Sequence, residues 1–273
     1  MPFFTNDDVQ LFYTSDGPSS SPRPPLLLLH GWACDSHDFS HQIPYLVSLN
    51  LHVVALDHRG HGRSSTPSSV TNYTMYTLAD DVLALLKHLR INSVIIVAHS
   101  MSTIIASILA VQNPEVVKAL VLLQPIYCGV PTISDMVKTM QGNAEVAPAL
   151  TAKFFAGFMY TPRTPNWLKT WHIRRVLGTD PIALSGCLEG IVDLFGTVVG
   201  QSDETHSFMQ RRKAPKLIMC TSSLPAAEKW ENEVGLEKGV DRLEMLDEGT
   251  FSHIVVSERV NEILGEWFEK LRC

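Results

Sequence analysis

Six short apolar runs, separated by stretches of helix length, are the feature that most limits what this chain can fold into. Each run is four or five residues long and largely apolar, as strands buried on both faces usually are. The alternation of such runs with amphipathic segments predicts an α/β fold, a mostly parallel twisted sheet flanked by helices. The runs are Leu26–Leu29, Val53–Leu56, Val94–Ala98, Leu120–Leu123, Leu217–Cys220 and Leu243–Leu246.

Three further segments carry local signals for a hairpin and for two helices. Phe3-Phe4 and the run from Val9 to Tyr13 flank a polar turn, which predicts an N-terminal hairpin. Apolar residues at helical spacing predict one helix that Thr77 caps and that ends before Asn92, and another from Glu258 to Leu271.

The strand pattern stops between residues 130 and 213. This stretch has helical patterns interrupted by prolines and is rich in Phe, Tyr and Trp. A helical insert between two strands of one sheet is expected to lie over the strand ends. We therefore predict an α/β core made of residues 1–129 and 214–273, and a helical lid inserted at residues 130–213.

Composition excludes several classes of function. The 22 Lys and Arg residues against 28 Asp and Glu give a formal charge of −6, so no basic surface for nucleic acid is expected. No apolar run approaches the roughly 18 residues of a membrane span, and the N-terminus does not resemble a secretory signal, so we expect a cytoplasmic protein without membrane contacts. The five cysteines lack metal-ligand spacing and are expected to be reduced core residues.

The segment around Ser100 carries the strongest chemical signal. An apolar strand runs into a tight turn at Ser100, and a helical pattern follows at once. This layout suits a nucleophile elbow, in which a strained serine lifts its hydroxyl above the sheet. The flanking residues Ala98 and Ser102 are small, as the close approach of strand and helix requires.

Three other segments accompany this turn in a characteristic order. They are the loop His30-Gly31-Trp32, the stretch Asp57 to Ser64, and His253 after the last predicted strand. Together with Ser100 they resemble the α/β-hydrolase fold superfamily over nearly the whole chain. The resemblance implies that Asp57 to Ser64 form a structural turn.

The same resemblance assigns catalytic roles. It implies that Ser100 is the nucleophile, that His253 is its base, and that the backbone amides of Trp32 and Met101 form the oxyanion site. A neutral imidazole would take the serine proton while the alkoxide attacks a carbonyl.

The third member of the triad departs from the family pattern. Family members usually place a carboxylate after the strand that follows the insert, but residues 221–225 read Thr-Ser-Ser-Leu-Pro. A minority place it at the position that Gln124 occupies here. Asp193, Glu228 and Glu248 are non-standard candidates. Because replacing the triad acid by its amide lowers turnover by ~10⁴ in a serine protease, slow ester hydrolysis or a different reaction is expected.

Three functions therefore remain open. The first is a serine hydrolase that cleaves an ester, a lactone or an activated C–C bond of a small apolar or aromatic metabolite. The second is a cofactor-independent histidine-base enzyme, because the chain partly resembles the 3-hydroxy-4-oxoquinoline dioxygenases; a lyase or isomerase would also fit. The third is a catalytically silent small-molecule binding protein.

The expected binding partner is in each case a small molecule, and the oligomeric state is left open. We expect neither a metal nor an organic cofactor. The residues expected to contact the substrate are His30, Tyr127, Phe155, Phe158 and Trp167.

Overall fold

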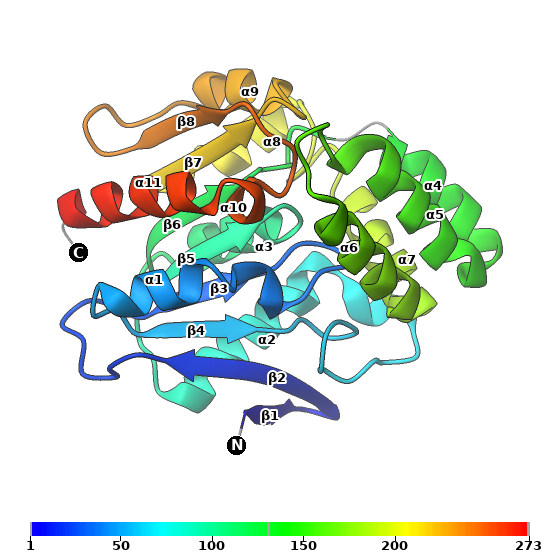
Figure 1. Ribbon diagram of the computed structural model, residues 1–273, viewed down its shortest axis with the longest axis horizontal. Coiled ribbons are helices and arrows are strands. Elements are labelled where there is room, and N and C mark those ends of the chain that lie inside the picture. Colours follow the sequence, from blue (N-terminus) through cyan, green and yellow to red (C-terminus); the bar gives the residue numbers. More distant parts are fainter. Residues whose placement is uncertain (1, 130–131, 272–273) are drawn as a thin grey trace.

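An eight-stranded twisted sheet forms the centre of the computed structural model, which describes residues 2–129 and 132–271 (Figure 1). The strand order is β1-β2-β4-β3-β5-β6-β7-β8, and only β2 runs antiparallel to its neighbours. The predicted hairpin and mostly parallel sheet are confirmed. The strands are β1 (Phe3–Asn6), β2 (Val9–Asp16), β3 (Leu26–Leu29), β4 (Val53–Leu56), β5 (Val94–His99), β6 (Val117–Leu123), β7 (Lys216–Thr221) and β8 (Arg242–Leu246).

Helices cover both faces of this sheet. Leu27 and Leu29 of β3 belong to one apolar cluster and Leu26 and Leu28 to another, because successive strand residues point to opposite faces. Residues of α2 (Met75–Leu89), α3 (Ser102–Gln112) and α9 (Ala226–Val234) pack in the first cluster, and α1 (Gln42–Ser48) and α11 (Ser257–Lys270) pack against the second. No helix in the described ranges is long and apolar enough to cross a bilayer.

The start of α2 differs from the prediction. Its cap is Thr74 rather than Thr77, because the Thr74 hydroxyl accepts the Thr77 backbone N–H at 3.1 Å. The helix ends at Leu89, where Arg90 adopts a left-handed backbone with φ 56°.

A group of helices connects β6 to β7. Figure 1 shows α4, α5, α6 and α7 gathered beyond the carboxyl ends of the parallel strands. The division into core and lid remains a prediction, and its first lid residue, Val130, lies outside the described residues. The helices are α4 (Thr132–Gly142), α5 (Ala147–Phe154), α6 (Asn166–Gly178), α7 (Pro181–Val192) and α8 (Asp203–Met209), with a π-helical turn at Phe155–Met159.

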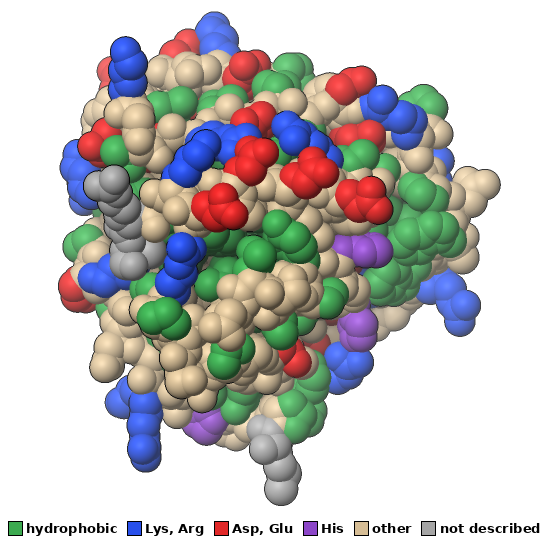
Figure 2. Space-filling view, turned by 60° about the vertical axis from the view of Figure 1, so that its left-hand side comes forward, with side chains coloured by type: hydrophobic (Ala, Val, Ile, Leu, Met, Phe, Trp, Pro, Cys, Tyr) green, Lys and Arg blue, Asp and Glu red, His purple; other side chains and the backbone are tan. Residues whose placement is uncertain are grey.

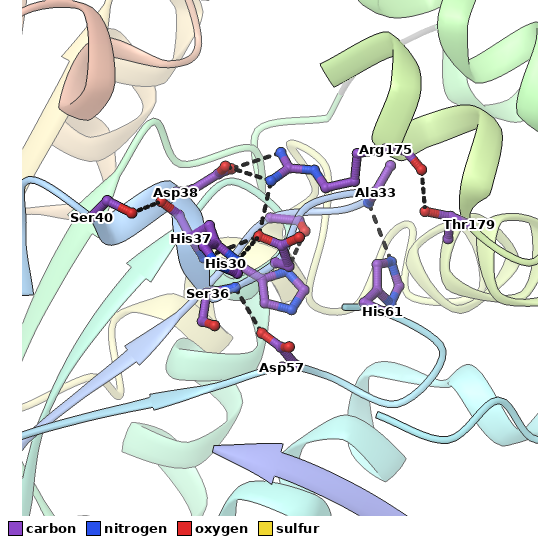
Figure 3. Close-up of polar contacts among 12 residues, drawn as sticks. His30, Ala33, Ser36, His37, Asp38, Ser40, Asp57, His61, Arg175 and Thr179 are labelled. Carbon is purple, nitrogen blue, oxygen red and sulfur yellow. Dashed lines mark hydrogen bonds and ion pairs between the residues drawn. The ribbon is translucent and has the colours of Figure 1, made fainter. Parts of the chain in front are cut away.

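A buried ion pair fastens these helices to the core. Figure 3 shows Arg175 of α6 reaching the loop after β3, where it donates to Asp38 at 2.7 and 3.2 Å and to Asp35 at 3.0 Å. Burial alone would raise the pKa of Asp38, but the Arg175 guanidinium outweighs that effect and holds it well below its usual range. Asp38 is therefore ionised in the interior.

The turn after β4 is organised by Asp57. Its carboxylate accepts the backbone N–H groups of Ser36 at 2.8 Å and Arg63 at 3.0 Å, and the Ser64 hydroxyl donates to its carbonyl at 2.6 Å. Gly62 has φ 55°, and a Cβ there would collide with the Asp57 carboxylate. The segment from Asp57 to Ser64 is thus a tightly packed turn.

Surface charges contribute less. On the face shown in Figure 2, acidic and basic side chains lie side by side. Partly exposed pairs such as Arg242 with Glu266, at 2.9 Å, contribute about 0–1 kcal/mol each. Stability therefore depends mainly on the two apolar clusters and on the buried polar contacts described above.

We expect Arg175→Met to lower the free energy of unfolding by about 3–5 kcal/mol, because it leaves the Asp38 carboxylate buried without a counter-charge. Urea denaturation at pH 7 measures this loss. Arg174→Met is the matched control, since Arg174 is exposed on the same helix, and it should change stability by no more than about 0.5 kcal/mol. Equal stability of the two variants would contradict the anchoring role of Arg175.

We expect Gly62→Ala to destabilise the chain by about 1–3 kcal/mol or more, because a left-handed backbone is strained for alanine and the new methyl group meets Asp57. Thermal unfolding followed by circular dichroism measures the effect. Gly178→Ala, at the end of α6 with nothing within 4 Å of the new Cβ, serves as control and should be near neutral.

Candidate active site

Ser100 lies in the strained turn that its sequence predicts. It has φ 51°, follows β5 directly, and donates its backbone N–H to the Leu123 carbonyl at 2.9 Å. Ala98 and Ser102 on either side are fully buried. A Cβ on Gly31 would lie 2.9 Å from His99 Nδ1 and 3.2 Å from the Ser100 Cβ, so glycine allows the close approach of the loop after β3 to the end of β5.

Two adjoining cavities open at Ser100. The larger, of about 250 Å³, and the smaller, of about 40 Å³, share a wall of Ser100, Ile126, Phe154, Met159 and Thr250. An apolar cavity with a few polar groups is typical of small-molecule sites. Another hollow, of about 650 Å³ beside Trp267, is lined by none of the predicted site residues.

The predicted oxyanion donors lie beside Ser100. Neither the Trp32 nor the Met101 backbone amide has a hydrogen-bond acceptor within residues 2–129 and 132–271. The Trp32 indole donates to the Leu184 carbonyl at 3.0 Å, which fixes this loop against α7. Both amides are therefore free for a ligand oxygen, and their catalytic role remains a prediction.

The structure does not join His253 to Ser100. His253 is fully buried in the short helix α10 (Ser252–Val255), and neither of its ring nitrogens has a hydrogen-bond partner among the described residues. It lines neither cavity, and its ring instead lies 4.4 Å from that of His99. Burial lowers the pKa of His253 well below its usual value, so the ring is neutral. The expected hydrogen bond between the two residues is absent.

Thr250, three positions before His253 in the loop after β8, is the residue of that loop that lines both cavities with Ser100. A threonine hydroxyl cannot accept a proton at neutral pH. Gly249 marks the close approach, because a Cβ there would lie 2.8 Å from the Met159 carbonyl. That glycine is the sequence signal that could have directed attention to Thr250.

Gln124, the predicted third-member position, lies in the larger cavity with Ser100. Its backbone is left-handed, with φ 50°. Its side-chain oxygen accepts the Thr221 hydroxyl at 2.6 Å, and its amide nitrogen donates to the Ser223 hydroxyl at 3.4 Å. Gln124 thus forms a hydrogen-bonded set of uncharged side chains with Thr221 and Ser223. It makes no hydrogen bond to the His253 ring nitrogens. The candidate acids Asp193, Glu228 and Glu248 line neither cavity.

Two of the five expected substrate contacts line the cavities. Phe158 lines the larger one and Phe155 the smaller one. Trp167 lines neither, because it lies on the outer side of α6, is 53% exposed and stacks on Trp171.

His30 and Tyr127 also line neither cavity, because distant polar groups hold them in the core. The His30 ring contacts the Gly31 carbonyl through Nδ1 at 2.8 Å and accepts the His58 backbone N–H through Nε2 at 3.0 Å. The Tyr127 hydroxyl accepts a hydrogen bond from the buried Arg212 at 3.0 Å. No motif or spacing in the sequence indicates these partners.

Comparison with known proteins relates this arrangement to a family. Over 100 residues the chain is 37% identical to epoxide hydrolase 3 of Siraitia grosvenorii, which is 37% of this chain and 32% of that protein. Over 96 residues it is 35% identical to a bifunctional esterase/perhydrolase of Acinetobacter calcoaceticus, covering 35% and 33%. The chain thus spans about a third of the length of these curated relatives.

Solved structures share the whole fold. The enol-lactonase from Burkholderia xenovorans LB400 superposes with a TM-score of 0.81 at 19% identity, over 98% of this chain and 100% of that one. At that identity the likeness concerns the fold alone. A sequence model of the alpha/beta hydrolase fold matches residues 24–168, which is more than half of the chain. The chain belongs to the α/β-hydrolase fold family.

Proposed function

We propose that this chain is a hydrolase that cleaves an ester or lactone of a small apolar or aromatic molecule bound above Ser100. The observation that carries the proposal is the strained serine at the floor of an apolar cavity of about 250 Å³, beside two free backbone amides. The names of two relatives, an esterase/perhydrolase and an enol-lactonase, support the substrate class.

The reaction follows from the groups at the cavity. The Ser100 oxygen attacks the carbonyl carbon, and the Trp32 and Met101 amides stabilise the negative charge on the carbonyl oxygen. The C–O bond then breaks, the alcohol leaves with the proton that came from serine, and water hydrolyses the acyl-serine. In a lactone the leaving alcohol stays attached to the acyl group.

Proton transfer limits this chemistry. Among the described residues, no titratable side chain lines the larger cavity beside Thr250 and Gln124, so with a substrate bound there the serine proton passes to water or to the leaving oxygen. An oxyanion site and substrate binding alone retain about 10³–10⁴-fold catalysis over water in a serine protease stripped of its triad. We therefore expect slow turnover.

The lack of a titratable side chain among the described residues that line the larger cavity favours one alternative, a binding protein without turnover. A neutral, apolar cavity that lacks a base can hold a small molecule without transforming it. The histidine-base alternative is not favoured, because the His253 ring lines neither cavity.

A fluorophosphonate probe separates these possibilities. We expect one adduct, located on Ser100 by mass spectrometry, together with slow hydrolysis of an aryl ester, and we expect Ser100→Ala to abolish both. Ser223→Ala is the matched control, since Ser223 lines the same cavity and should leave labelling intact. An unlabelled wild-type chain that still binds aryl esters would refute hydrolysis and support the binding protein.

We expect Thr250→His to raise Ser100-dependent ester hydrolysis at least about 10-fold, because a positioned general base contributes about 10²–10⁴-fold. Adding Gln124→Asp should raise the rate further, since a carboxylate stabilises the imidazolium. Steady-state rates with an aryl acetate measure both effects. Thr250→Val, which keeps the side-chain shape without a base, is the control, and a rate for Thr250→His no higher than for Thr250→Val would show that position 250 does not reach the serine.

A further inference from the structure

A second group of chemically capable side chains lies near Ser100, and two of its members line the smaller cavity with that serine. Cys34, Asp38 and His99 each offer one potential ligand atom, and these atoms all lie within 4.8 Å of one another. None of the three residues is more than 2% exposed. The Arg175 ion pair accounts for Asp38 and the Thr250 carbonyl for His99 Nε2, but the contacts described above leave the Cys34 thiol and His99 Nδ1 without a role.

The hydrogen bonding of His99 prepares one nitrogen as a ligand. Its Nε2 lies 2.9 Å from the Thr250 carbonyl, which can only accept, so Nε2 carries the proton. Nδ1 therefore holds a lone pair, and it has no hydrogen-bond partner among the described residues. A metal-binding histidine usually donates its other N–H to a carbonyl or carboxylate in this way.

Unpaired polar atoms concentrate around this group. Of the ten buried side-chain nitrogen and oxygen atoms without a partner in the described ranges, five belong to neighbours of Asp38. They are His99 Nδ1, His172 Nε2, both ring nitrogens of His253, and Arg175 Nε. Because buried polar groups in native proteins are nearly always paired, these atoms need partners that the described residues do not supply.

We propose that Cys34 Sγ, one Asp38 oxygen and His99 Nδ1 bind a divalent transition metal ion of the zinc or cobalt class. Sulfur, nitrogen and oxygen donors together suit these ions, and three protein ligands leave a fourth position open. His253 offers a further donor, since its ring lies 4.4 Å from that of His99. A cavity of about 40 Å³ lined by Cys34, His99 and Ser100 gives access from the serine side.

The nearby Arg175 guanidinium is compatible with a cation at this site. It holds Asp38 from the side of α6 and also contacts Asp35. With a divalent ion and a Cys34 thiolate present, the formal charges of the ion, the thiolate, the two carboxylates and Arg175 cancel. The metal must displace the Cys34 thiol proton, so affinity should increase with pH.

The test uses the full chain, freed of metal with a chelator and then titrated with Co²⁺, with Zn²⁺ as competitor. We expect one Co²⁺ per chain, a thiolate-to-cobalt absorption band, and a higher midpoint of thermal unfolding. Cys34→Ser should abolish the band, and His99→Gln should weaken binding at least about 100-fold, the upper end of the loss that outer-shell changes cause.

Two control variants make the test specific. Cys187→Ser removes another fully buried thiol outside this group and should bind Co²⁺ as the wild type does. Ser100→Ala should also bind normally, so loss of hydrolysis and loss of metal are separable. The proposal is overturned if the wild type shows no thiolate band, if Cys34→Ser keeps it, or if Co²⁺ leaves thermal unfolding unchanged, the result expected where only water pairs with these nitrogens.

Discussion

The left-handed backbone of Ser100 is the constraint around which the site is arranged. Such a conformation costs about 1–3 kcal/mol for a residue with a side chain, so the surroundings must impose it. β5 is buried along its whole length. The helix α3 begins two residues after Ser100, and nearly all of its side chains are buried. The Ser100 backbone N–H is paired with the Leu123 carbonyl. The fold therefore fixes the serine whether or not catalysis is fast.

The loop after β8 is held through its backbone, so the contacts that position it do not depend on the side chain at position 250. His99 bonds the backbone carbonyl of Thr250, not its side chain, and Gly249 allows the close passage beside Met159. A different residue at position 250 would keep both contacts. A threonine there therefore costs the fold little, and it places no titratable side chain beside Ser100. This explains how the serine geometry and the missing base coexist in one site.

The sequence predicted those parts of the molecule that depend on local pattern. The runs such as Leu26–Leu29 form strands because they are buried on both faces, and the turn at Ser100 follows from its small neighbours. The position of the His253 ring could not be predicted in this way, because it depends on how many residues the preceding loop uses to reach Ser100.

The sequence pattern likewise could not predict contacts between side chains that lie far apart along the chain. Tyr127 bonds Arg212, 85 residues away, and Arg175 bonds Asp38, 137 residues away. No periodicity or motif relates residues so far apart, so their roles emerge only when the fold brings them together. The grouping of Cys34, Asp38 and His99 belongs to the same class, because its members come from two different loop and strand ends.

Arg175 connects the proposed metal site at Asp38 with the helices that lie over the cavities beside Ser100. The same guanidinium that fastens α6 to the core keeps Asp38 ionised, and an ionised Asp38 is what a metal ion would bind. Phe154 and Met159, from the same connection between β6 and β7, wall both cavities beside Ser100. The ion pair therefore fastens to the core the same connection that supplies these two wall residues.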